Sequence, residues 1–96
     1  MIEEVLWSQV AHIDRSRLRE WLEQISPVKA QNVAELILSA IEKLKIHPRL
    51  GRRLSIFQNG EVRELFISPY VMRYAIMERK IYILRIWHYR EDRSTE

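Results

Sequence analysis

The chain has 96 residues, no cysteine and a formal net charge of +3. A chain of this length buries one hydrophobic core, so we expect a single domain over residues 1–96. Hydrophobic residues make up 47% of the sequence and charged residues 30%, a balance typical of a folded domain rather than of a disordered tail. The lack of cysteine excludes a disulfide framework and a thiolate zinc site.

The N-terminal sequence and the distribution of charge predict where the protein is located and which kinds of partner it binds. The start of the chain, MIEEVLW, has acids where a secretion signal needs basic residues, and no apolar run approaches the roughly 20 residues of a membrane span. We therefore expect a cytoplasmic protein without a membrane partner. Residues 1–48 hold six Lys and Arg against seven Asp and Glu, a charge of −1, whereas residues 49–96 hold ten against six, a charge of +4. A basic face favours a polyanion or an acidic protein partner, with a solvated surface as the alternative.

The first half of the chain predicts one strand and two helices. Residues 2–7 mix β-branched and aromatic side chains, which favours a short strand. Over residues 9–25 the apolar side chains recur with the i, i+3, i+4, i+7 spacing of one helix face. Pro27 suits the first position of a second helix, over residues 27–46, which Pro48 prevents from continuing.

Beyond this point β-branched and aromatic residues dominate and predict four strands. These strands span residues 54–58, 61–67, 70–77 and 81–88. Asn59-Gly60 best tolerates the positive φ angles of a tight hairpin turn, and Pro69 separates the second strand from the third. The element order predicts an α+β fold, with an N-terminal strand and a two-helix hairpin packed on one face of a curved, mainly antiparallel sheet of four or five strands. The other face is then open to a nucleic acid or a partner's segment.

The length of the last turn determines which side chains share a face of the sheet. If Glu78 and Arg79 form a two-residue turn, Arg73 shares a face with His88. A three-residue turn places Arg73 opposite Arg85, where the two charges repel unless an acid or anion lies between them. Either register predicts a basic strip on the sheet.

Four segments carry a resemblance to a known family. They are Pro48–Leu54 (PRLGRRL), Val62–Leu65 (VREL), Pro69–Tyr74 (PYVMRY) and Ile83–Glu91 (ILRIWHYRE). In this order they resemble the RelE/ParE superfamily of bacterial type II toxins, and the resemblance extends over essentially the whole chain. It implies the RelE/ParE-like fold and a growth-inhibiting toxin that a cognate antitoxin neutralises. No cofactor is implied.

The superfamily divides into two activities. RelE-type members cleave messenger RNA in the ribosome without a metal ion, which requires proton transfer to and from ribose and leaving oxygens and cations to stabilise the phosphate. ParE-type members instead inhibit DNA gyrase and lack the catalytic set. A third alternative is a degenerate toxin that acts only in a repressor complex with its antitoxin.

The matching positions favour the nuclease. His88 and Tyr89 resemble the terminal His-Tyr pair of the YoeB branch, in which these side chains serve the proton transfers, and Arg90 resembles a phosphate-binding residue just after the last strand. Val71 departs from the pattern, because nucleolytic relatives have an arginine there, and Arg73 on the same face of the strand is the candidate replacement. The chain also ends without the C-terminal helix of the RelE branch, as ParE-like members do. The prediction is an endoribonuclease with these four polar residues as its catalytic set and gyrase inhibition as the alternative.

Other arginines are candidates for nucleic-acid binding, since guanidinium forks suit phosphate groups. They are Arg49, Arg52, Arg53, Arg63 and Arg85. A solvated loop is an equally simple interpretation of the first three. Glu64 is more simply an ion-pair partner than a catalytic base. No metal site is expected, since His12 and His47 have no partner at ligand spacing.

Overall fold

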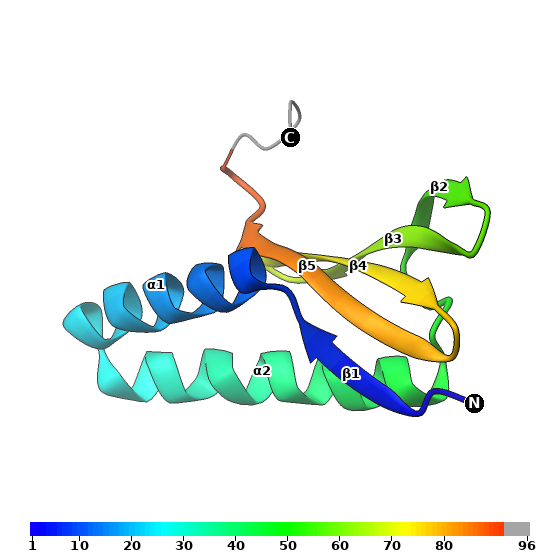
Figure 1. The fold of residues 1–96 in the computed structure, drawn as a ribbon. Coiled ribbons are helices and arrows are strands. Elements are labelled where there is room, and N and C mark those ends of the chain that lie inside the picture. Colours follow the sequence, from blue (N-terminus) through cyan, green and yellow to red (C-terminus); the bar gives the residue numbers. More distant parts are fainter. Residues whose placement is uncertain (92–96) are drawn as a thin grey trace.

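The fold is that of a computed structural model, in which the structure of residues 1–91 is described (Figure 1). Its elements are β1 (Glu4–Trp7), α1 (Gln9–Ile25), α2 (Pro27–Ile46), β2 (Arg52–Phe57), β3 (Gly60–Ile67), β4 (Tyr70–Met77) and β5 (Lys80–His88). The five strands form one sheet in the order β1-β5-β4-β3-β2, in which β1 runs parallel to β5 and all other neighbours are antiparallel. The predicted α+β fold class is confirmed.

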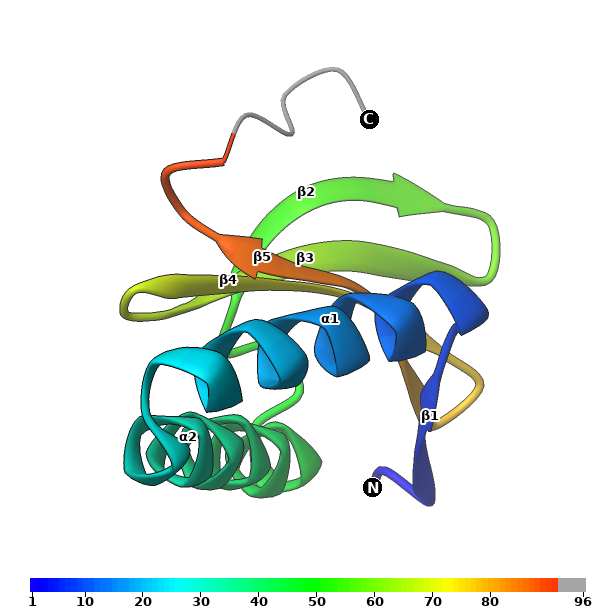
Figure 2. The ribbon, with the colours of Figure 1, turned by 90° about the vertical axis from the view of Figure 1, so that its left-hand side faces the viewer.

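The two helices begin at serine caps and lie on one side of the sheet. The Ser8 hydroxyl accepts the Ala11 N–H at 3.0 Å, and the Ser26 hydroxyl accepts the Lys29 N–H at 3.2 Å, so each helix start has a partner for a backbone donor. Figure 2 shows α1 running beside β5 and α2 packed next to it. The core lies between this hairpin and the sheet. Its fully buried members include Leu22, Leu44, Met72, Tyr74, Ile81 and Ile83.

A β-bulge in β5 sets which side chains face the helices. Glu78 and Arg79 form a two-residue turn with φ angles of 50° and 68°, since Met77 pairs with Lys80. Near this turn Tyr74 pairs with Ile83, but the register then shifts and Leu84 is left as the extra residue. The pairing register that the two-residue turn sets between β4 and β5 therefore holds only as far as Ile83, and beyond the bulge it is shifted by one residue.

The bulge places Arg73 and His88 on opposite faces of the sheet. Beyond the bulge Arg73 pairs with Arg85, while His88 pairs with Tyr70. Residues directly opposed in an antiparallel pair share a face, and buried Tyr70 belongs to the helix-covered face. Arg73 and Arg85 therefore point to the open face, and His88 points toward the helices.

The first hairpin differs from its prediction. Its turn is Gln58-Asn59, because Phe57 pairs with Gly60, and neither residue of the predicted Asn59-Gly60 turn has a positive φ angle. Gly60 instead allows a close strand approach, since a Cβ atom there would lie 2.1 Å from the carbonyl oxygen of Ile76. Four strands also differ slightly from their predicted starts: β1 begins two residues later, β2 two residues earlier, and β3 and β5 each one residue earlier.

The loop after α2 is fixed to the sheet by Tyr74 and Arg63. The Tyr74 hydroxyl donates to the carbonyl oxygen of Pro48 at 2.7 Å and accepts the N–H of Gly51 at 2.9 Å. Arg63 donates to the carbonyl oxygen of Gly51 at 2.6 Å. Burial raises the pKa of the Tyr74 hydroxyl, so its proton is retained for the bond to Pro48. The basic loop is thereby held in one position relative to β3 and β4.

Replacing Tyr74 by phenylalanine is expected to lower the free energy of unfolding by about 1–3 kcal/mol, because two buried backbone groups lose their partner. Urea denaturation followed by circular dichroism measures the change. Tyr82→Phe is the matched control, since the Tyr82 hydroxyl makes no hydrogen bond to residues 1–91, and it should cost about 0.5 kcal/mol or less. Equal losses in the two variants would contradict this role for Tyr74.

Glu61 gives the same loop a pH-dependent anchor. Its carboxylate accepts hydrogen bonds from Arg63 and Arg49. Partial burial raises the pKa of Glu61, but the two arginines outweigh burial and leave it below its ordinary value of 4.5. A carboxyl group with a lowered pKa stabilises the folded state above its unfolded pKa, and this stabilisation is lost as the pH falls through the folded pKa.

Glu61→Gln should therefore unfold more easily than the wild type at pH 7, by about 1 kcal/mol, with the difference shrinking as the pH falls below about 4. Paired urea titrations at several pH values measure it. Glu42→Gln serves as the control, because Glu42 pairs with Lys45 on an exposed helix surface and contributes little. A wild-type advantage that persists unchanged at low pH would refute the assignment.

Candidate functional site

Three of the predicted catalytic residues form one cluster at the end of β5. The ring of His88 stacks on Tyr89, with centroids 5.3 Å apart and planes at 22°. The same ring meets Tyr70 edge to face, with centroids 5.6 Å apart. Arg90 donates from Nε to the Tyr89 hydroxyl at 3.3 Å. The structure thus brings His88, Tyr89 and Arg90 together.

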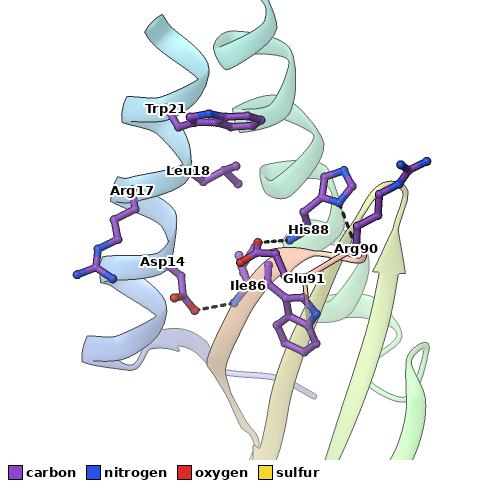
Figure 3. Close-up of a pocket in the computed structure, with 9 residues that line it drawn as sticks. Asp14, Arg17, Leu18, Trp21, Ile86, His88, Arg90 and Glu91 are labelled. Atoms are coloured by element: carbon purple, nitrogen blue, oxygen red, sulfur yellow. Dashed lines mark hydrogen bonds between the residues drawn. The ribbon is translucent and has the colours of Figure 1, made fainter. Parts of the chain in front are cut away.

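Two hydrogen bonds fold the turn after β5 around His88 (Figure 3). The backbone N–H of Arg90 donates to Nδ1 of His88 at 3.1 Å, and the backbone N–H of His88 donates to Glu91 Oε1 at 2.9 Å. Because Nδ1 accepts a backbone N–H, the ring proton of this arrangement is assigned to Nε2. Among residues 1–91, Nε2 has no hydrogen-bond partner. His88 therefore has one ring nitrogen available to a ligand.

A groove of about 610 Å³ lies beside this cluster, between α1 and the end of β5 (Figure 3). One wall is a stripe of α1 at i, i+3, i+4 and i+7, and the other is the end of β5 with its following turn. The lining residues are Asp14, Arg17, Leu18 and Trp21 on the first wall and Ile86, Trp87, His88, Arg90 and Glu91 on the second. The groove combines an apolar lining with charged groups, as ligand-binding concavities do.

Arg73 is not part of this cluster. It lies on the open face, where its Nε and Nη2 atoms donate to Glu64 Oε2 at 2.9 and 2.7 Å. Its guanidinium group also lies over the ring of Trp87, 5.0 Å from the centroid. Val71, the position where nucleolytic relatives have arginine, shares this face. The sheet therefore separates Arg73 from His88.

Arg85 connects the sheet to α1. Its Nε atom donates to Asp14 Oδ2 at 2.8 Å, and the same oxygen accepts the backbone N–H of Ile86 at 3.0 Å. The side chain of Asp14 is only 8% exposed. Arg73 and Arg85 are directly opposed, as one of the two predicted registers required, and each has its own acid, Glu64 or Asp14. Their mutual repulsion is offset within the chain.

The remaining predicted nucleic-acid ligands lie away from His88, around β2 and its preceding loop. Arg63 is held by Glu61, and Arg49 lies 3.1 Å from the same carboxylate. Arg52 lies 3.7 Å from Glu64, so Glu64 is an ion-pair partner. Arg53 is exposed on the edge strand and has no ion-pair partner among the described residues. The phosphate-binding role of these arginines stays a prediction.

Sequence reasoning missed the contribution of α1 to the groove. Trp21 fits the apolar spacing of a core stripe, yet the residue is 55% exposed at the groove wall. The signal in the sequence that indicates this groove wall is the i, i+3, i+4, i+7 spacing of Asp14, Arg17, Leu18 and Trp21. This spacing places two charged residues on the same helix stripe as the tryptophan.

Residues 1–91 contain no group of three or more His, Asp or Glu side chains placed to hold a metal ion. Within the same part of the chain, neither helix has both the length and the apolar character needed to cross a membrane.

Comparison with known proteins identifies the family. Residues 5–93 match the model of the ParE toxin of the type II toxin–antitoxin system parDE. Toxin RelE3 of Caulobacter vibrioides is 40% identical over 87 residues, covering 86% of this chain and 90% of that protein. Toxin RelE2 of the same organism is 33% identical over 86 residues, covering 88% and 93%.

A solved chain, from the chromosomal ParDE toxin–antitoxin system of P. aeruginosa, shares the fold. It superposes with a TM-score of 0.69 at 23% identity, over 92% of this chain and 96% of that chain. The resemblance predicted from the four sequence segments is confirmed. The chain belongs to the ParE toxin family, within the RelE/ParE superfamily of type II toxin–antitoxin systems.

Proposed function

We propose that this toxin arrests growth by binding a protein target, DNA gyrase, and not by cleaving messenger RNA. The observation that carries the proposal is the separation of Arg73 from His88 by the sheet. Cleavage needs an acid/base group and a charge-stabilising cation around one phosphate. Arg73, the predicted replacement for the arginine missing at Val71, lies on the opposite face of the sheet from His88 and is bound there to Glu64.

The ion pairs of the half-buried arginines on the sheet also favour a binding function. Arg63, Arg73 and Arg85 are each 13–20% exposed at the side chain and each is paired with an acid of the chain. Transferring such a guanidinium to phosphate would leave a poorly solvated carboxylate without its partner, which costs several kcal/mol. The same carboxylates would repel the phosphate. The sheet arginines therefore serve the fold, and the toxin is left with surface recognition.

One observation favours the nuclease as a second candidate. His88, Tyr89 and Arg90 are in mutual contact, and His88 Nε2 has no partner among the described residues. In that case His88 or Tyr89 would transfer the protons and Arg90 would be the cation nearest the phosphate. The nuclease hypothesis therefore rests on His88, Tyr89 and Arg90 alone.

Two assays on the wild-type toxin separate the candidates. Purified toxin, freed from its antitoxin, is expected to inhibit DNA supercoiling by gyrase in the concentration range in which it binds the enzyme. Transcripts mapped after induction in a bacterial host should remain intact while growth stops. Ribosome-dependent cleavage of transcripts with normal supercoiling would refute the proposal in favour of the nuclease. A toxin that leaves growth unaffected when expressed alone would refute both.

A further inference from the structure

We infer that the groove between α1 and the end of β5 is the surface that receives the target protein, and that the bound segment presents an apolar or aromatic side chain next to a carboxylate. The inference rests on the proposed binding function and adds to it the surface and the chemistry of the contact. It is carried by the apolar wall of the groove and by the charges on its rims.

The apolar wall has the composition of a binding hot spot. Trp21 is 55% exposed, and Ile25, one helical turn beyond the groove, extends the exposed apolar surface of α1 with 56% exposure. Leu18 and Ile86 continue this lining into the groove. Tryptophan and arginine dominate the binding energy of protein interfaces when they line a pocket that a partner can desolvate. A volume of about 610 Å³ is large enough for one bulky side chain of a partner together with its neighbours.

The charges determine what the partner must carry. Asp14 is already paired with Arg85, and Glu91 accepts the backbone N–H of His88. Arg17 and Arg90, by contrast, are exposed and have no carboxylate partner within residues 1–91. When Arg85 is counted against Asp14, and Arg17 and Arg90 against Glu91, the groove carries a net positive charge, and a carboxylate on the partner complements it.

The arrangement suits a protein segment better than an RNA strand. Arg17 and Arg90 stand on opposite walls, on α1 and on the turn after β5 (Figure 3). A single strand of RNA is instead followed along its backbone by a row of cations. The carboxylates of Asp14 and Glu91 also line the groove and would repel successive phosphates. One acidic side chain flanked by apolar ones needs no such row of cations, and it brings a single negative charge near these carboxylates where an RNA strand brings several.

Two variants test the surface, each chosen at exposed positions so that the fold is kept. Arg17→Glu/Arg90→Glu reverses the rim charge, and Trp21→Ala removes the apolar wall. Each is expected to weaken binding to purified gyrase holoenzyme by about tenfold or more and to relieve growth arrest. Arg17→Lys/Arg90→Lys keeps the charge and should bind within about threefold of the wild type. Circular dichroism melting checks that every variant is folded.

Lys29→Glu/Lys43→Glu is the matched control, since it makes the same change of net charge on exposed positions of α2 outside the groove. It should bind and arrest growth like the wild type. If the groove variants arrest growth as the wild type does, or if the control loses as much activity as they do, the inference is wrong.

The outcomes also separate this inference from the proposed function. If the wild type inhibits gyrase and the folded groove variants do so equally, the groove assignment fails while the proposed function stands. If the wild type does not bind gyrase and cleaves no transcript, but the groove variants no longer arrest growth, the groove stands with a different protein target. If the variants lose ribosome-dependent transcript cleavage instead, the groove takes RNA and the inference is overturned.

Discussion

The bulge at Leu84 decides which side chains of β5 share a face of the sheet, and contacts from the start of α1 hold this bulge in place. The Ser8 hydroxyl donates to the carbonyl oxygen of Leu84 at 3.1 Å, and the Ser8 N–H donates to that of Ile83 at 2.9 Å. Two residues beyond the bulge, Asp14 accepts the N–H of Ile86. β1 pairs with β5 only as far as Ile83, so α1 supplies partners for an edge that would otherwise be unpaired. The residues that start the helix therefore also fix the register of the last strand.

This register divides the charged residues between two faces with different roles. On the open face, Arg73 and Arg85 are opposed and would destabilise the sheet without Glu64 and Asp14. On the helix-covered face, His88 follows the core residue Ile86 and reaches the groove at the end of the strand. One inserted residue thus changes the predicted single basic strip into an internally neutralised row and a separate concave site. The interpretation of the toxin as a binding protein follows from that division.

The fold was largely predictable because its determinants are local in sequence. The serine caps and Pro27 place both helices at their observed bounds, and the runs of β-branched and aromatic residues indicate the number of strands. The bulge was not predictable, since it depends on Ser8 and Asp14, which lie about 70 or more residues away in the sequence.

The same contrast between local and distant determinants holds for the candidate site. His88–Arg90 are consecutive and so lie together, whereas the relation of Arg73 to them required the register. The spacing that predicts α1 places Trp21 on the apolar stripe of that helix, but spacing alone does not reveal whether anything covers this side chain.

Net charge overstates how much of this surface is available to a polyanion. The +4 charge of the second half of the chain includes Arg63, Arg73 and Arg85, and these three are committed to Glu61, Glu64 and Asp14 in half-buried pairs. A domain of this size has one small core, so ion pairs that fasten a loop to the sheet and a helix to a strand edge contribute to holding its parts in place. Arginines used in this way are poor phosphate ligands, because releasing them exposes a carboxylate as well as a cation. Under the proposed binding function, the exposed arginines beside the apolar wall of the groove serve recognition, and their arrangement is that of a protein interface more than of a nucleic-acid channel.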